Sequence, residues 1–383
     1  MRAFDPRRLS VECFFAWLLI CSFPAHAADV VDRPVRNSFR HPGLLHTSED
    51  LDRIARQVKD EVQPTVDGFA IFAKHAQSQA NYRMRGPFSV VHRPGAGNNE
   101  FALDANAAYQ NALMYCINGN KAHAEKAVEI IDAWSLRLRG IVGHDSHLAA
   151  GLYGFKFVSA AELMRWRYDD WSPEKIARAE EMFREAIYPT VKNFAPFANG
   201  NWDGACIKTV MAIAVFCDDQ AMFDRATQYY LDGEGNGAIT HYVINEFGQC
   251  QESGRDQQHT QLGLGQLAES CEVAWHQGVD LYTAADNRLL KGFEYTAKYN
   301  LGQGVLFEPT IDITGKYHHR FISKEGRHRL RPIWEMAWNH YHPRQRLEMP
   351  YTQAVIEKIR PEGAGFHADH VGFGTLLFPK LEQ

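Results

Sequence analysis

The sequence lacks the short motifs that usually hold a metal ion or a nucleotide. It contains no HExxH, no paired CxxC, no P-loop, no dinucleotide-binding glycine fingerprint and no GxSxG. His144-x-x-His147 and His318-His319 could each contact a metal, but among 18 histidines such neighbours arise by chance. We therefore expect chemistry that requires neither a metal nor a cofactor.

Cysteine is scarce as well. Cys13 and Cys21 lie in an N-terminal apolar region, and the cysteines that follow are odd in number and lack CxxC spacing, so at most two disulfides can form among them. Cys116 and Cys271 fall on apolar helical stripes. We expect them to be buried as small hydrophobic side chains.

Long apolar runs are absent except near the N-terminus. There, Arg2, Arg7 and Arg8 precede an apolar run at 13–20, and an Ala-His-Ala cleavage site ends at Ala27. The run is too short to span a membrane, although an uncleaved anchor is the alternative. We expect a secretory signal peptide over residues 1–27, cleavage after Ala27, and a periplasmic or secreted protein without a membrane span.

Residues 28–383 are expected to form one domain, because no Ser/Pro-rich linker or long charge run interrupts them. Apolar residues recur at helical spacing, mostly in paired segments. Gly119-Asn120 ends one such segment and begins the next, and Ser172-Pro173 opens another. Helical patterns cover about 105–116, 124–134, 145–167, 173–187, 203–217, 219–231, 259–276, 281–300, 333–340 and 351–359.

Alternating strand patterns are few, with residues 238–247 and 304–313 as short candidates. Many helices joined by short turns predict an all-α fold built from helical hairpins. For an exported enzyme of this size we expect an α/α toroid, whose centre can collect polar groups from loops. An open solenoid would satisfy the same pattern.

The densest polar segment is residues 251–259, Gln-Glu-Ser-Gly-Arg-Asp-Gln-Gln-His, which contains no apolar side chain. If it enters a helix, Arg255 and His259 lie four residues apart on one face. A fixed cation beside a titratable imidazole suits removal of a proton next to a negatively charged group. The alternative is a buried Glu252–Arg255 ion pair that only fixes a loop.

Two further segments carry candidate groups. Asn199-Gly200-Asn201-Trp202 lies where a helix is expected to begin. An N-cap would explain one of the asparagines, whereas a sugar site would use both an asparagine amide and the tryptophan ring. Tyr295 and Tyr299 share a helical face, which is more often core than catalytic, although the polar residues beside them exceed what a core requires.

A basic segment runs from Lys316 to Arg331. It holds six Lys/Arg against the single acid Glu325, a local charge of +5 in a chain of net charge −5. A solvated basic face would explain it, and so would a cleft that attracts a polyanion. Nucleic acid is disfavoured, because the chain is expected to be exported and lacks a recognisable binding motif.

These groups suit β-elimination of a uronic-acid polysaccharide. A neutralising side chain stabilises the charge that develops when the C5 proton leaves, a His or Tyr takes that proton, and a Tyr can protonate the departing O4. The sequence also resembles the alginate-lyase-like family of polysaccharide lyases. The resemblance rests on Gly200-Asn201-Trp202, on residues 252–259, on Glu294-Tyr295-x-x-Lys298-Tyr299-Asn300-Leu301-Gly302, and on Arg360-Pro361-Glu362-Gly363 with Asp369-His370-x-Gly372-Phe373-Gly374-Thr375-Leu376.

The resemblance implies an α/α toroid and a metal-independent lyase. It makes Asn201 the carboxylate neutraliser, Arg255 its cationic partner, His259 the base or the group that tunes it, and Tyr299 the acid or base. The sequence has Asn201-Trp202 where some alginate lyases have Asn-His, so the histidine must come from elsewhere. Two rival tyrosines compete with Tyr299: Tyr295 and Tyr317.

Other polar and aromatic side chains of these segments are expected to bind the anionic polysaccharide, and Glu252 and Asp256 to orient Arg255 and His259. The substrate-binding set is Asn199, Trp202, Glu252, Tyr295, Tyr317, His318, His319 and Arg320.

Two other function classes fit the same residues. A glycoside hydrolase would use two carboxylates, Asp203 with Glu252 or Asp256, as acid and base. A non-catalytic glycan-binding protein would use the aromatic and basic groups alone. For a lyase, the sequence does not name the polymer: mannuronate and glucuronate require syn elimination, which one tyrosine can serve, whereas guluronate requires a base on the opposite face.

Overall fold

Helices dominate the computed structural model, which describes Met1, residues 38–365 and residues 369–379. The expected signal peptide lies outside the described residues and stays a prediction. The helices are α1 Ser48–Lys59, α2 Thr65–Lys74, α3 Asn98–Asn118, α4 Lys121–Arg137, α5 Ser146–Leu148, α6 Phe155–Arg167, α7 Pro173–Met182, α8 Tyr188–Val191, α9 Gly200–Phe216, α10 Gln220–Asp232, α11 Ile239–Tyr242, α12 Gln257–His276, α13 Ala284–Asn300, α14 Trp334–Asn339, α15 Pro350–Ile359 and α16 Gly374–Leu377.

Strands are short and pair only locally. β1 (Val90–His92) pairs in parallel with β2 (Gly140–Val142), and β3 (Thr310–Ile311) pairs antiparallel with β4 (His318–His319). Helical segments of other types add η1 (Ala76–Ser78), η2 (Ala149–Gly154), η3 (Phe183–Ile187) and η4 (His340–Arg344).

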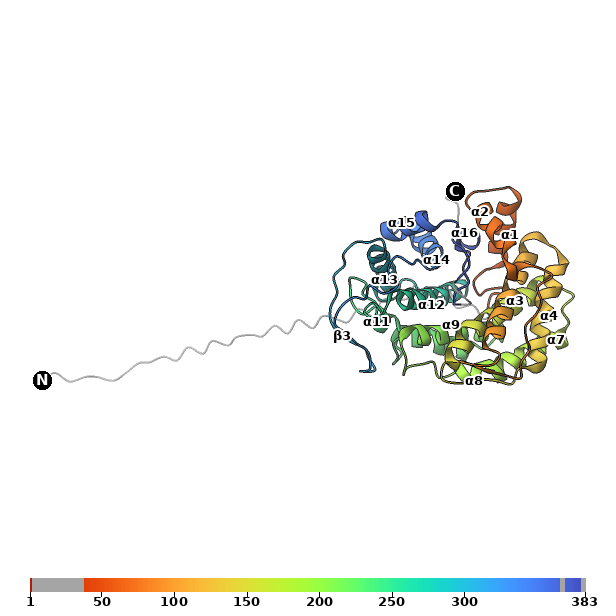
Figure 1. The fold of residues 1–383 in the computed structure, drawn as a ribbon, viewed down its shortest axis with the longest axis horizontal. Coiled ribbons are helices and arrows are strands. Elements are labelled where there is room, and N and C mark those ends of the chain that lie inside the picture. The colour runs from red at the N-terminus through yellow and green to blue at the C-terminus, as the bar shows by residue number, and fades with distance from the viewer. Residues whose placement is uncertain (2–37, 366–368, 380–383) are drawn as a thin grey trace.

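The helices form a ring around a central layer (Figure 1). α3, α6, α9 and α12 pack against one another in that order, and α4, α10 and α13 flank them. Every residue of α9 except Trp202 is buried, as expected for a helix that is apolar on nearly all sides. The N-terminal end of α9 and that of α12 lie beside each other, because the segment before α12 bonds to the start of α9.

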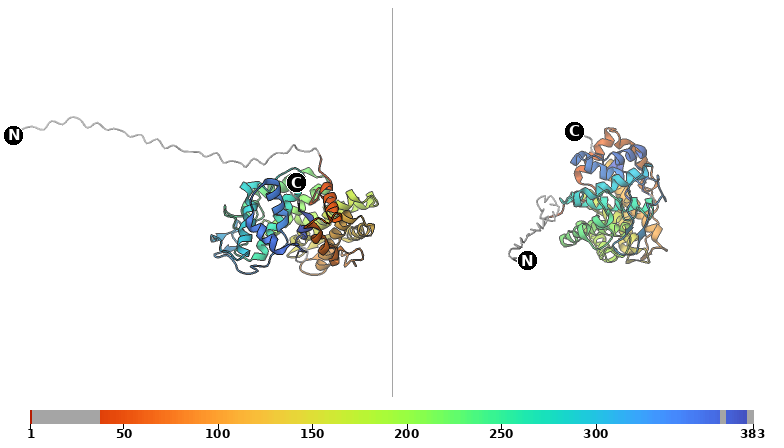
Figure 2. Two further views of the ribbon diagram at one scale, coloured as in Figure 1. Left: turned by 90° about the horizontal axis from the view of Figure 1, so that it is seen from above. Right: turned by 90° about the vertical axis from the view of Figure 1, so that its left-hand side faces the viewer.

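The first and last helices pack together in the α/α toroid that was expected from the sequence. α16 packs on α2, with the rings of Phe72 and Phe373 4.8 Å apart, edge to face. Arg53 Nη1 donates to the carbonyl of Pro379 at 2.6 Å. Figures 1 and 2 show the first helices beside the last ones.

One expected strand is wrong. Residues 238–247 include the short helix α11, and Val243 forms only an isolated bridge with Cys250. Ile239, Tyr242 and Val243 are spaced as i, i+3 and i+4, so their burial follows a helical period, which a short apolar run does not distinguish from a strand. The candidate at 304–313 is strand only in β3, and the expected strands did not include β1 and β2.

The remaining cysteines are buried and unpaired: Cys116, Cys206, Cys217, Cys250 and Cys271. The burial expected for Cys116 and Cys271 is confirmed. Among the described residues, no helix combines the length and apolar character needed to cross a bilayer.

A buried carboxyl group near the C-terminus makes the stability of the fold depend on pH. Glu362 Oε1 accepts from the backbone N–H of Trp334 at 2.8 Å, and the neighbouring Glu335 pairs with Arg360 at 2.7 Å. Burial, together with the charge of Glu335, raises the pKa of Glu362 to about 8 from 4.5. Because folding raises this pKa, the stability that the Glu362 carboxyl group contributes is fully present below pH 4.5. It is lost as the pH rises through about 8.

Replacing Glu362 with glutamine should therefore stabilise the protein at neutral and alkaline pH, on the order of 3 kcal/mol at about pH 7, since the amide carries no proton to lose. Urea unfolding over a pH series measures this effect. Glu335→Gln tests the cause of the raised pKa: it removes the partner of Arg360 together with the charge that raises the pKa of Glu362, so the stability of this variant should fall less steeply than that of the wild type between pH 4.5 and about 8. A wild-type and a Glu362→Gln stability curve that run parallel with pH would contradict the assignment.

Candidate active site

The polar segment 251–259 forms a turn followed by the first turn of α12. Asp256 is the N-cap, and its side chain accepts from the backbone N–H of Gln258 at 2.9 Å and of His259 at 2.8 Å. Arg255 therefore precedes the helix and does not lie on its face. The Arg255 and His259 side chains nevertheless meet, with Nη2 and Nε2 3.2 Å apart.

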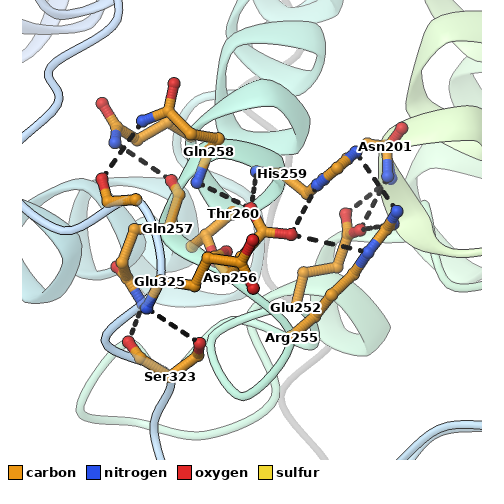
Figure 3. Close-up of polar contacts among 12 residues, drawn as sticks. Asn201, Glu252, Arg255, Asp256, Gln257, Gln258, His259, Thr260, Ser323 and Glu325 are labelled. Atoms are coloured by element: carbon orange, nitrogen blue, oxygen red, sulfur yellow. Dashed lines mark hydrogen bonds and ion pairs between the residues drawn. The ribbon is translucent and has the colours of Figure 1, made fainter.

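A buried carboxylate joins the start of α9 to this turn. Glu252 Oε1 accepts from Asn201 Nδ2 at 2.7 Å and from Arg255 Nη1 at 2.8 Å, while Oε2 accepts from the backbone N–H of Asn201 at 3.1 Å (Figure 3). Burial raises the pKa of Glu252, and the Arg255 charge opposes that rise. The carboxylate thus fixes both Asn201 and Arg255. The ion pair between Glu252 and Arg255, which was the alternative explanation of this segment, is present.

The two ring nitrogens of His259 have different partners. Its Nδ1 lies 2.6 Å from Asp256 Oδ2, and its Nε2 faces Arg255. A guanidinium has only donors, so Nε2 accepts from Arg255 and Nδ1–H donates to Asp256. Burial would raise the pKa of Asp256, but its hydrogen bonds with His259 and the charge of Arg255 lower it to about 2. The one acceptor atom of His259 is therefore occupied by Arg255.

Only part of this network reaches the surface. Asn201 and Glu252 are fully buried, whereas the side chains of Arg255 and His259 are 32% and 37% exposed. The buried Asn201 Oδ1 has no hydrogen-bond partner among the described residues. Arg255 and His259 are the groups of this network that a ligand can touch without displacing protein.

The β3–β4 hairpin is held over this turn by one carboxylate. Asp312 accepts from the backbone N–H of Lys316 at 2.9 Å, from that of Tyr317 at 2.8 Å, and from Asn236 Nδ2 at 2.8 Å. Sequence reasoning did not include Asn236 and Asp312. The local sequence Asp-Ile-Thr-Gly at 312–315 is a turn signal, but nothing in it indicates the distant asparagine.

The chain that follows the hairpin packs directly on the polar turn. Ser323 N–H donates to the carbonyl of Ser253 at 2.9 Å. Gly254 faces the Cβ of His319 so closely that a side chain at position 254 would collide with it. This close approach explains the glycine in the middle of the polar segment and brings β4 to the side of Arg255.

Tyr317 and His319 both face the Arg255 region. They are two residues apart in extended chain and so share a face of the hairpin. Burial raises the pKa of Tyr317 and the Arg255 charge opposes this, whereas burial and Arg255 both lower the pKa of His319. His318, on the other face, is exposed, and its Nε2 lies 3.0 Å from the Gly315 carbonyl oxygen.

The two tyrosines of α13 have other surroundings. Tyr295 donates its hydroxyl to the carbonyl of Leu306 at 2.6 Å. Tyr299 is 4% exposed, the Arg327 guanidinium stacks 4.0 Å from its ring centroid, and its hydroxyl has no partner among the described residues. Within the described chain, no hydrogen bond joins either tyrosine to Arg255 or His259. The sequence-based choice of Tyr299 stays a prediction.

The basic segment is only partly available to a ligand. Arg327 binds the carbonyl of Tyr299 at 2.8 Å, and Arg331 pairs with Asp369 at 2.8 Å. Arg320 and Lys324 are exposed, and among the described residues no carboxylate lies within ion-pair distance of either. Part of the local charge of +5 therefore stabilises the fold, and part of it is exposed and available to a ligand.

Asn199 and Trp202, the two other residues predicted at the start of α9, have different surroundings. Asn199 is buried, and its Oδ1 accepts from Gln251 Nε2 at 3.0 Å. Trp202 is half-buried in the first turn of α9, with its ring centroid 5.9 Å from that of His144. Asn199 thus supports the turn, while Trp202 reaches the surface beside Asn201.

Solved structures of alginate lyases share this fold. The alginate lyase A1-III from Sphingomonas species A1 superposes with a TM-score of 0.64 at 13% identity, over 91% of this chain and 100% of that chain. An alginate lyase from Bacteroides ovatus superposes with a TM-score of 0.57 at 14% identity, over 88% of this chain and 99% of that chain. These likenesses establish the toroid, while none of the curated proteins matches the chain.

The sequence itself carries the family assignment. The family model described as alginate lyase matches residues 74–305, which is more than half of the 383 residues. The match contains the start of α9, the polar turn and α13, which supply Asn201, Arg255 and Tyr299. The chain therefore belongs to the alginate lyase family and is a polysaccharide lyase.

Proposed function

We propose that the protein cleaves a polymer of β-D-mannuronate or β-D-glucuronate by β-elimination. The observation that carries this proposal is the partly exposed guanidinium of Arg255, held by Glu252 and His259 next to the tyrosine of a neighbouring hairpin. Elimination from a uronate requires a cation at the carboxylate and a proton-transfer group near C5 and O4. Both kinds of group meet here.

In this proposal Arg255 neutralises the substrate carboxylate. When the C5 proton leaves, negative charge grows on the carboxylate, and a fixed cation stabilises it without reorganising. The Glu252 carboxylate accepts from the guanidinium and fixes it, and Asn201 donates to the same carboxylate. Asn201 then supports the neutraliser from its buried position, and its Oδ1 remains available to a substrate hydroxyl if the first turn of α9 shifts.

Tyr317 is the proposed proton-transfer group. As a phenolate beside Arg255 it takes the C5 proton, and the resulting phenol returns a proton to O4 as the glycosidic bond breaks. His259 is less suited to be the base, because its acceptor nitrogen already binds Arg255. One residue that serves as both base and acid works from a single face of the sugar, which favours syn elimination and hence mannuronate or glucuronate.

Two more groups support substrate binding in the same place. The lowered pKa of His319 keeps its ring neutral, and its buried Nε2 has no partner among the described residues, so it can bind a sugar hydroxyl. The Trp202 ring offers an apolar face to a sugar. A variant of the A1-III alginate lyase was solved in complex with a tetrasaccharide, which supports an oligosaccharide as the ligand of this fold.

The surroundings of the carboxylates weigh against the hydrolase alternative. Asp203 is fully buried and accepts from the backbone N–H groups of Ala195 and Gly237, each at 2.8 Å. Glu252 is buried under Arg255, and Asp256 is committed to His259. A hydrolase needs an acid and a base that face the glycosidic bond, and none of these three carboxylates is placed to do so.

Ultraviolet absorbance on a panel of polymers tests the proposal. Purified protein is incubated with polymannuronate, polyguluronate, glucuronan and a neutral glucan, and the conjugated double bond of the product is followed. We expect absorbance to rise with polymannuronate or glucuronan, and much more slowly with polyguluronate. New reducing ends without absorbance would replace the proposed lyase reaction with hydrolysis.

A further inference from the structure

A second group of aromatic and basic side chains surrounds the loop that precedes α9. Phe197, in the loop before α9, is 47% exposed, although Phe194 three residues earlier is buried. Its ring centroid lies 5.1 Å from that of His147 and 6.0 Å from Lys316 Nζ. Lys316 Nζ also donates to the Phe197 carbonyl at 2.8 Å, which fixes the ammonium beside the ring.

The histidines of this group come from a third part of the chain. β2 ends at Val142, whose carbonyl accepts from Arg93 N–H at 2.9 Å, and Asp145 N–H donates to the Arg93 carbonyl at 3.0 Å. These bonds place the loop that follows β2 against the start of α9. There the His144 ring meets Trp202 edge-on, and Asp145 Oδ1 lies 2.5 Å from His144 Nδ1.

Packing leaves Phe197 exposed and Trp202 only half-buried. Both rings leave apolar surface in water, which monomeric proteins tend to limit unless the surface binds something. The His147 and His144 rings stand nearly perpendicular to them, Lys316 Nζ lies over one face of the Phe197 ring, and Asp145 alone among their described contacts is acidic. Flat apolar faces bordered by donors and a cation match a sugar ring that carries a carboxylate.

We propose that Phe197, Trp202 and Lys316, with His144 and His147, form a second subsite for an acidic sugar of the polymer. Trp202 follows Asn201 and Lys316 precedes Tyr317 in the sequence, so we expect the sugar on this subsite to neighbour the one that is cleaved. The inference rests on the proposed function, because it assumes that the polymer crosses the Arg255 site. It implies that chains long enough to fill both subsites bind more tightly than short ones.

Binding of oligomers of two lengths tests the subsite. Dissociation constants of tetramannuronate, tetraglucuronate and the matching disaccharides are measured by calorimetry in a Tyr317→Phe background, with ultraviolet absorbance as a check for turnover. Phe197→Ala should weaken binding of the tetrasaccharide about 10-fold, as expected for one lost stacking contact, and that of the disaccharide less than about 2-fold. Phe197→Trp, which keeps a ring, should bind like the parent.

Trp166→Ala is the matched control. Trp166 is also an exposed aromatic residue (45%), but its neighbour Arg165 binds the carbonyl of Phe216 at the opposite end of α9, roughly 24 Å from Asn201 by helix length. This variant should bind both lengths normally. Lys316→Gln should weaken tetrasaccharide binding at low salt and do so less as salt rises.

Three results would separate the outcomes. If Phe197→Ala weakens both lengths equally, or neither, the subsite is refuted while the lyase reaction can stand. If the oligomers bind with the expected length dependence but the wild-type enzyme yields no unsaturated product, the proposed function fails and the subsite stands. If no acidic oligomer binds to the wild-type protein, both are refuted.

Discussion

Arg255→Ala should lower kcat/KM for the uronate polymer by about three orders of magnitude, since it removes the fixed cation from the developing carboxylate charge. Arg255→Lys should recover little of the loss. A lysine has one nitrogen and cannot bind Glu252 and His259 together, as the two terminal nitrogens of Arg255 do. The measurement is the initial rate of ultraviolet absorbance over a range of polymer concentrations.

Stability has to be separated from chemistry in this experiment. Removal of Arg255 leaves the buried Glu252 carboxylate without its cation, which costs about 3 to 5 kcal/mol. The double variant Glu252→Gln/Arg255→Ala removes that unpaired charge and should regain most of the stability but none of the activity. Arg137→Ala, at an exposed arginine of α4 without an ion pair in the described chain, should change kcat/KM less than about 3-fold. Full activity in the double variant would refute the role of Arg255.

The second large effect is expected at Tyr317. Tyr317→Phe removes the hydroxyl that carries the proton and should lower kcat by about 10³-fold with little change in KM. The Arg255 charge favours the phenolate, so Arg255→Ala should also move the alkaline rise of residual activity to higher pH. Rates measured over a pH series at saturating polymer test both statements.

Tyr299→Phe is the matched control for that experiment. The Tyr299 ring is stacked by Arg327 and its hydroxyl is buried, so its loss should leave kcat within about 3-fold of the wild type. His319→Gln distinguishes a binding role from proton transfer, because a binding role raises KM more than it lowers kcat. If Tyr299→Phe is inactive and Tyr317→Phe is active, the proton-transfer group is Tyr299 in α13 and not Tyr317.

Much of the fold could be predicted from the sequence, because its long helices bury regular apolar stripes. α9 and α12 begin within about three residues of their predicted starts, and Gly119 and Asn120 cap the helices that they were expected to cap. The prediction of a strand at 238–247 was wrong because the segment has too few buried residues to distinguish the period of two of a strand from the period of 3.6 of a helix. β1 and β2 are held by a pairing of distant segments, which short local patterns do not reveal.

The site was predictable in its members more than in their arrangement. Arg255 and His259 meet as expected, although Arg255 precedes α12 instead of sharing a helical face with His259. The bond that fixes Asn201 comes from Glu252, 51 positions away. Tyr317 could not be ranked above the α13 tyrosines, because the bond between Asn236 and Asp312 that holds its hairpin spans 76 positions. Local spacing does not encode such contacts.

The central claim is that cleavage proceeds by elimination at a site built on Arg255 and Tyr317. Digestion of polymannuronate and glucuronan in heavy-oxygen water, followed by mass spectrometry of the products, tests it most directly. Elimination adds no water, so the new ends should be unlabelled, the unsaturated fragments should be lighter by one water than saturated ones, and Tyr317→Phe should form almost none. Products that carry heavy oxygen at the new reducing end would contradict the claim.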